Sequence, residues 1–231
     1  MIAGHYATAL VPEKTPSASQ LAFFLVASQL PDLAWFALTF LGLAPVHTHA
    51  GPAHLELIVT HDLLPTLPWV GLAALAGRAL FGDWRPGGIA AALVAVHAAS
   101  DLLSGYPHFV AGPDTPGLDL GLYYSAPQLA IVIEAGFAAA ILAWVIRRER
   151  QHGLARGALT WAGRALVFGG GLATSFVTAD GLGNLPPNGT LPMSMAAGLL
   201  GLYAGQIAVL TFTESRPPVG ESTKQWAPAA G

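Results

Sequence analysis

The stretch APQLAIVIEAGFAAAILAWVI, residues 126–146, contains one ionisable side chain, that of Glu134. An α-helix rises about 1.5 Å per residue, so this stretch is long enough to cross the roughly 30 Å hydrocarbon core of a bilayer. Five further apolar runs extend over residues 21–43, 66–81, 88–103, 158–177 and 193–212. The sequence therefore predicts an all-α protein, a polytopic helical membrane bundle with six transmembrane helices in a single domain over residues 1–214.

The composition excludes an ordinary soluble domain. Of 231 residues, 53% are hydrophobic and 10% are charged, against about 25% charged in a typical soluble protein, and the mean hydropathy is +0.54. The net charge of -3 offers no basic surface for a phosphate backbone, so we expect no nucleic-acid partner. The absence of cysteine excludes disulfides and thiolate metal sites, which leaves oxygen and imidazole groups for any chemistry.

The distribution of basic residues predicts the topology. Segments 44–65, 104–125 and 178–192 contain no Lys or Arg, and such residues are enriched in cytoplasmic loops. We therefore expect both termini in the cytoplasm and these three segments outside. The remaining segments or the ends of spans beside them hold all the basic residues, namely Lys14, Arg78, Arg85, Arg147, Arg148, Arg150, Arg156, Arg164, Arg216 and Lys224.

The two ends of the chain give weaker signals. Residues 1–11 are apolar but too short to cross, and they lack the basic region of a cleavable signal peptide. A re-entrant half-helix is an alternative there. Residues 12–19, PEKTPSAS, read as a turn with Ser17 or Ser19 as a helix N-cap. We expect the polar tail, residues 215–231, to be disordered and cytoplasmic.

Three acidic residues fall inside predicted spans: Asp32, Asp101 and Glu134. Each costs about 2.5–3.5 kcal/mol at the centre of a membrane helix. At about 1.5 Å per residue, all three lie within roughly 3–17 Å of the outer boundary. No basic residue is placed to neutralise them, so either a bound metal or protonation must account for their presence.

The histidines point to the same region, since seven of the eight precede residue 110. His97 and Asp101 are four residues apart and share one face of a helix, so an imidazole and a carboxylate can meet one cation. Two others, His61 and His108, lie where the chain enters or leaves the outer ends of spans. His152, beside the arginine cluster, reads as an ordinary surface residue.

Structural roles remain alternatives for these residues. A single histidine in a helix is often hydrogen-bonded without binding a metal, and Asp32 after Pro31 could be the N-cap of a resumed helix. Glu134 could be a protonated acid hydrogen-bonded between helices. The glycines at 169–171 indicate close helix packing.

Together, the motifs GHYATAL, SQLPDLAW, THDLLP, VHAASDLL, PHF and the later Glu134 resemble those of the bacterial family of membrane-bound metal-dependent hydrolases. The order and rough spacing agree over residues 4–134, while the last two spans (158–213) carry no part of the pattern. A more distant likeness connects the chain to zinc-dependent phospholipases C and fungal single-strand nucleases.

The resemblance implies a hydrolase that acts on a phosphoester or lipid-linked substrate through water activated by a divalent metal, zinc being the expected ion. The apolar spans and the distribution of basic residues predict an integral protein in contact with the lipid bilayer, with its site facing outside, and the resemblance to a bacterial family implies the inner membrane. Asp32 and Glu134 would be the catalytic carboxylates. The implied metal ligands are His5, Asp32, His61, His97, Asp101, His108 and Glu134. A metal-ion or proton transporter and a metal-stabilised scaffold without turnover are the alternatives.

The chain departs from the family pattern at several positions. Asp62 follows His61 where serine is usual, Trp35 or a neighbour replaces a second carboxylate, and no histidine lies four residues before Glu134. His49 and His54 offer an alternative match to the middle motif, so either could replace His61 as the ligand. His47 reads as a loop residue. His5 joins the others only if the N-terminal segment enters the membrane.

Overall fold

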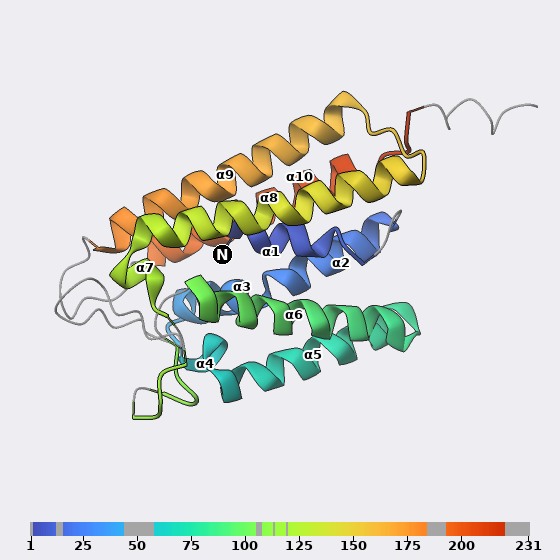
Figure 1. Cartoon of the computed structure of the whole chain (residues 1–231). Helices are drawn as coiled ribbons and strands as arrows, with labels where there is room; N and C mark the ends of the chain where they lie inside the picture. Colours follow the sequence, from blue (N-terminus) through green and yellow to red (C-terminus); the bar gives the residue numbers. More distant parts are fainter. Residues whose placement is uncertain are drawn as a thin grey trace, which may run out of the picture.

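The computed structural model describes residues 2–12, 16–43, 58–104, 108–112, 114–118, 120–183 and 193–219. These residues form helices and no β-strand, apart from one isolated bridge between Phe109 and Gly117, so the prediction of an all-α fold is confirmed. The helices are α1 (Ile2–Ala9), α2 (Ala18–Ser28), α3 (Leu30–Phe40), α4 (Ile58–His61), α5 (Leu63–Phe81), α6 (Trp84–Ser104), α7 (Leu122–Ser125), α8 (Pro127–Gln151), α9 (Ala158–Gly183) and α10 (Met193–Glu214). Figure 1 shows the long helices side by side in one bundle.

Four helices, α5, α6, α8 and α10, are long and apolar enough to cross a membrane, and α2 with α3 adds a fifth if the bent pair is one span. The 26-residue α9 is not among them over its described residues. Much of the surface of these helices is apolar, with exposed leucines at positions such as Leu72, Leu75 and Leu80. An exposed apolar surface of this extent is expected where lipid replaces water. The structure is thus an all-helical bundle with four or five candidate membrane spans, against the six predicted.

The run predicted as one span over residues 21–43 is broken in the structure. Helices α2 and α3 meet at Gln29 with a bend of 70°. Pro31 lies in the first turn of α3, and its ring nitrogen cannot donate to the preceding turn, which ends or kinks a helix at this point. The start of α2 is as predicted: Ser17 accepts a hydrogen bond from the backbone N–H of Gln20 and forms a capping box with it.

Helix α1 is short and lies inside the bundle, with all eight of its residues buried. It begins near the middle of the molecule (Figure 1) and packs against α8, α9, α2 and α6. Gly171 of α9 permits this approach, because a Cβ there would lie 3.3 Å from the Cβ of Ala3. This agrees with the close packing expected of the glycines at 169–171. A helix of this length cannot span a bilayer, so α1 enters the bundle and returns through α2.

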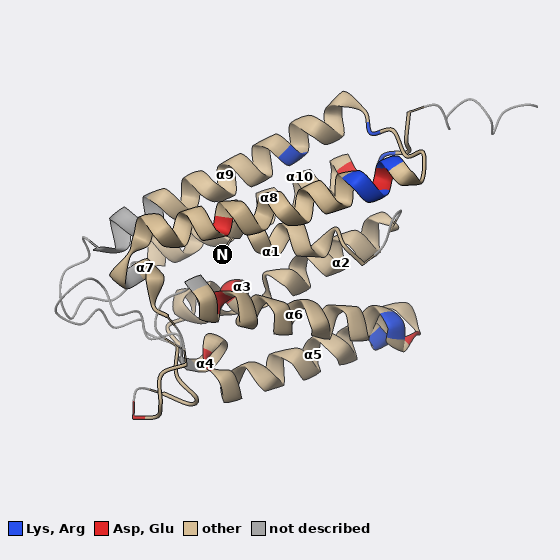
Figure 2. Ribbon diagram, viewed as in Figure 1, with Lys and Arg blue, Asp and Glu red and all other residues tan. Residues whose placement is uncertain are grey.

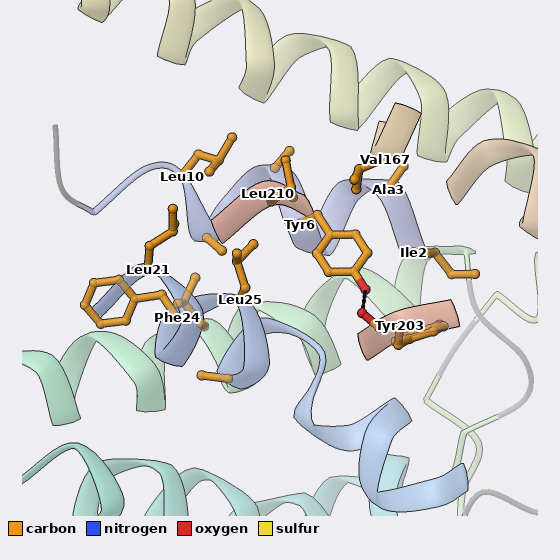
Figure 3. Close-up of a cluster of buried hydrophobic side chains, with 14 of the residues drawn as sticks. Ile2, Ala3, Tyr6, Leu10, Leu21, Phe24, Leu25, Val167, Tyr203 and Leu210 are labelled. Carbon is orange, nitrogen blue, oxygen red and sulfur yellow. Dashed lines mark hydrogen bonds between the residues drawn. The ribbon is translucent and has the colours of Figure 1, made fainter. Parts of the chain in front are cut away.

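Apolar side chains fill the space between α1, α2 and α10. Figure 3 shows Leu10, Leu21, Phe24, Leu25 and Leu210 in one cluster. At one side of the cluster the hydroxyl of Tyr6 donates to the backbone carbonyl of Tyr203 over 3.4 Å. The cluster fixes α1 within the bundle by burial of apolar surface and by close packing.

The basic side chains of the described residues gather at one end of the bundle. Figure 2 shows them at the α5–α6 connection and where α8 ends and α9 begins. At this end Arg164 is buried and donates to both carboxylates of a pair, to Glu149 over 2.8 and 3.0 Å and to Glu214 over 2.5 and 2.9 Å. Arg156 donates to Glu149 over 2.8 Å. The network joins α8, α9 and the end of α10.

The chain after α10 folds back onto this same end. The backbone N–H of Val219 donates to the carbonyl of Ala155 over 2.8 Å. The first residues of the segment predicted as a disordered tail therefore contact the α8–α9 connection. Residues 220–231 lie outside the described residues.

Candidate metal centre

His97 and Asp101, on α6, form the centre of a cluster of imidazoles and carboxylates. Nε2 of His97 lies 3.1 Å from Oδ2 of Asp101, as the four-residue spacing predicts. Both side chains are buried. The other ring nitrogen of His97, Nδ1, lies 2.7 Å from the backbone carbonyl of Ser28. A carbonyl oxygen only accepts, so Nδ1 carries the hydrogen and Nε2 is the nitrogen that faces the carboxylate.

The α2–α3 break makes the Ser28 carbonyl available. Within a continuous helix this oxygen would accept from the N–H four residues later, in the first turn after Pro31. The bend at Gln29 ends that hydrogen-bond ladder, and His97 becomes the partner of the oxygen. The proline thus orients the imidazole of a different helix and fixes its tautomer, in the manner of an outer-shell partner of a metal ligand.

Asp32 and His61 enter the cluster from the other side. Asp32 lies in the first turn of α3 and His61 ends α4, and Nε2 of His61 is 3.1 Å from Oδ1 of Asp32. The same nitrogen is 3.9 Å from Oδ2 of Asp101, and Nε2 of His97 is 4.0 Å from Oδ1 of Asp32. The carboxylates of Asp32 and Asp101 therefore flank the same two imidazoles.

His5 reaches the cluster from the buried helix α1. Its Nε2 is 3.2 Å from Oδ1 of Asp101, and its ring stacks on that of His97 with centroids 3.7 Å apart. The side chain has no exposed surface. The expectation that the N-terminal segment would have to enter the bundle for His5 to join the other residues agrees with the position of α1.

The donor atoms form two overlapping groups, each with its atoms within 4.8 Å of one another: His5, His97 and Asp101, and Asp32, His61 and His97. Ligands about 2.1 Å from a tetrahedral ion lie about 3.4 Å from each other, and the nitrogen–oxygen distances of 3.1–4.0 Å bracket that value. Nε2 of His97 makes no hydrogen bond within the described residues. Lone pairs of imidazole and carboxylate that face one another in this way fit a shared cation.

His108 lies beside this cluster but belongs to neither group. It is buried, and its ring centroid is 5.7 Å from that of His61, with the rings nearly perpendicular. Its backbone carbonyl accepts from the N–H of Leu118 over 3.0 Å. The structure thus brings His108 next to His61 without placing it among the donor atoms that face one another.

Glu134 also lies outside both groups. It is fully buried on α8, and its Oε1 accepts from the backbone N–H of Ala3 over 2.8 Å. Its Oε2 accepts from the hydroxyl of Ser175 over 2.9 Å and from that of Tyr123. These contacts correspond to the alternative of a carboxyl group hydrogen-bonded between helices. They also fasten the first turn of α1, which carries His5.

Asp62, which departs from the family pattern, has a structural partner. Its Oδ1 accepts from the N–H of Phe109 over 3.0 Å, and its Oδ2 accepts from that of Gly112 over 2.6 Å. Leu63 and Leu64 donate backbone hydrogen bonds to Phe109 and Val110. Asp62 therefore holds the segment after α6 against the start of α5, next to His61. Each of these N–H groups meets a separate carboxylate oxygen, an arrangement that the single hydroxyl oxygen of a serine could not reproduce.

Of the other histidines, His152 is exposed, as expected. The alternative ligands His49 and His54, and the loop residue His47, lie outside the described residues.

Tyr203 is a residue of the site that the sequence did not reveal. Its hydroxyl donates to Oδ2 of Asp32 over 2.9 Å, from α10. The resemblance ended at residue 134, so the last spans seemed to carry no part of the site. A buried tyrosine in an apolar span needs a hydrogen-bond partner, and that need was the one signal available.

Comparison of the chain with models of protein families, with curated proteins and with solved structures finds no match.

Proposed function

We propose that the protein is a membrane-embedded hydrolase that uses a divalent metal ion, with zinc the best fit to the donors. The observation that carries this proposal is the convergence of two carboxylates and three imidazoles inside an apolar bundle. Buried carboxylates are costly unless paired, whereas structural metal binding returns about 10–16 kcal/mol. Imidazole and carboxylate donors together suit zinc better than magnesium or calcium, which prefer oxygen alone.

His5, His61, His97, Asp101 and Asp32 would hold the ion. When bound, such an ion supplies a Lewis acid that activates water for hydrolysis near neutral pH. Asp32 has the most exposed side chain among these residues, 13%, against 7% or less for the others. We assign to Asp32 the orientation of the attacking water, with Tyr203 holding the second carboxylate oxygen in place. Glu134 would act at a distance by fastening α1.

The proposed reaction is cleavage of a phosphoester, in which the water oxygen bonds to phosphorus and the alcohol leaves with a proton. Two considerations support a lipid or lipid-linked substrate. The donor cluster lies within a bundle whose surface is largely apolar, and a substrate must reach it from the bilayer or its surface. The family resemblance of the motifs points to the same class.

We further propose that six elements cross the bacterial inner membrane, α2 with α3 and α9 included, with both termini in the cytoplasm. The gathering of arginines at one end of the bundle supports this orientation, because basic residues favour the cytoplasmic side. The donor cluster is displaced from that end, since Asp101 lies near the opposite end of α6 from Arg85. The site would then face the outside.

Transport is the competing function, because buried Asp and His also mark ion pathways. The described residues between the donor cluster and the arginine-rich end argue against it. Apolar side chains such as Leu10, Leu21, Phe24 and Leu25 fill that region (Figure 3). At its far side Leu10 meets Arg148, whose guanidinium donates to the carbonyl of Leu10 over 3.0 Å. The side chains of these four apolar residues offer an ion no ligand.

Elemental analysis of the purified protein, followed by assays on phosphomonoesters, phosphodiesters and phospholipid vesicles, tests the proposal. We expect bound zinc and chelator-sensitive hydrolysis, with both lost in His97→Ala and Asp101→Ala. His152→Ala, at an exposed histidine, is the matched control and should retain both. Metal uptake into proteoliposomes with no ester hydrolysis would overturn the proposal in favour of transport, and metal-free active protein would overturn the metal centre.

A further inference from the structure

A groove lies between α2 and α10 on the surface of the bundle. Its volume is about 650 Å³. Small side chains form much of its wall, Ala18 and Ala22 from α2 and Ala204 and Ala208 from α10. Larger apolar side chains border it, among them Val26, which is 38% exposed, and Phe212, which is 54% exposed. The groove is therefore a hollow lined by small side chains and bordered by larger apolar ones.

The polarity of the groove changes along its length. At one end it is lined by Leu33 and Ala204, and at the other end by Thr211 and Ser215. The hydroxyl of Thr211 makes no hydrogen bond within the described residues. Just beyond Ser215, Arg216 is exposed and its guanidinium carbon lies 4.3 Å from the ring centroid of Phe212. The polar end thus combines hydroxyl groups with a positive charge.

The length of the groove matches one lipid leaflet. From Ala204 to Ser215 it runs along the second half of α10 and the residue after it, about 16 Å at 1.5 Å per residue. This is about half of the 30 Å hydrocarbon core of a bilayer. A groove of that length, apolar except at one end, suits the tail and the polar headgroup of a single lipid.

We propose that this groove binds an anionic phospholipid of the leaflet at the arginine-rich end. Its acyl chain lies between α2 and α10, and its phosphate contacts the guanidinium of Arg216 and the hydroxyl of Ser215. A basic residue near the surface of an anionic leaflet adds to affinity in this way. The site is separate from the donor cluster and does not depend on the proposed hydrolysis.

The test uses phosphatidylglycerol with a photoreactive group in its acyl chain, added to the full-length protein in nanodiscs, with labelled peptides mapped by mass spectrometry. We expect labelling concentrated on Ala18–Ser28 and Met193–Glu214, displaced by unlabelled phosphatidylglycerol and not by phosphatidylcholine. Arg216→Gln leaves the groove intact and should weaken this binding about fivefold, the effect of one basic residue near a membrane surface.

Ala208→Trp fills the groove and should abolish the labelling of α2. Ala197→Trp, at an exposed position of the same helix outside the groove, is the matched control and should leave it unchanged. His97→Ala should also leave it unchanged, which keeps this test distinct from that of the metal centre. Labelling spread evenly over the exposed faces of α5 and α8 would overturn the proposal, as would equal competition by phosphatidylcholine. Phosphatidylglycerol binding that is unchanged in Arg216→Gln, or a dimer cross-linked through α10, would also overturn it.

Discussion

The backbone N–H of Ala3 donates to Oε1 of Glu134 over 2.8 Å, and this contact ties the first turn of α1 to the first third of α8. A carboxylate at the start of a helix also interacts favourably with the helix dipole. His5 follows Ala3 by two residues on the same short helix. Glu134, which the motif pattern suggested as a metal ligand, is thus placed to position His5, another candidate ligand.

Glu134→Gln should therefore weaken metal binding by about tenfold, the lower range for loss of an outer-shell partner. The effect should vanish in a His5→Ala background, because Glu134 then has no ligand left to position. Metal affinity measured by competition with a chelating dye, in the four proteins of this double-mutant cycle, checks the prediction. An undiminished effect of Glu134→Gln in the His5→Ala background would show that Glu134 binds the metal itself.

Tyr203→Phe removes the hydroxyl that donates to Asp32 and leaves the packing of the ring intact. We expect a 10–100-fold loss of metal affinity or hydrolysis, with little change in thermal stability. Tyr6→Phe is the control, since its hydroxyl donates over 3.4 Å to a backbone carbonyl and does not touch Asp32. Equal losses in the two variants would indicate a general effect on packing between α1 and α10.

Arg164→Ala should destabilise the bundle strongly, by about 3–5 kcal/mol, because it removes the four hydrogen bonds of a buried guanidinium and leaves Glu149 and Glu214 with Arg156 as their remaining partner among the described residues. Arg150→Ala, at an exposed position of the same end, should change stability by about 0.5 kcal/mol or less. Thermal unfolding of both variants in one detergent makes the comparison. A mild effect of Arg164→Ala would mean that water reaches the network.

The sequence predicted the helical class, an N-cap at Ser17 or Ser19, of which the structure uses Ser17, and the pairing of His97 with Asp101. Each of these depends on local composition or on the period of a helix. It did not predict the 70° bend at Gln29. Hydropathy averages over such a break, and Pro31 alone does not distinguish a kink from an end. The Tyr203–Asp32 contact joins residues 171 positions apart, and no periodicity reports on contacts of that range.

His97 limits the number of metal ions that the two donor groups could hold. Its Nδ1 is engaged with the carbonyl of Ser28, so only Nε2 can bind a metal. Both candidate donor groups require that nitrogen, and one lone pair serves one ion. We therefore expect one metal ion per chain, which both His5 from the first donor group and His61 from the second can bind.

Elemental analysis against protein concentration determined by amino-acid analysis should give a ratio of one. His5→Ala and His61→Ala should each weaken the binding of that single ion, since each removes one donor and leaves His97 in place. The bound ion should also raise the midpoint of thermal unfolding, because a ligand held at 100 times its Kd adds about 2.7 kcal/mol. That increase should be absent in His97→Ala. A ratio of two, falling to one in either His5→Ala or His61→Ala, would instead mean that the two groups bind separate ions and that His97 changes its partner.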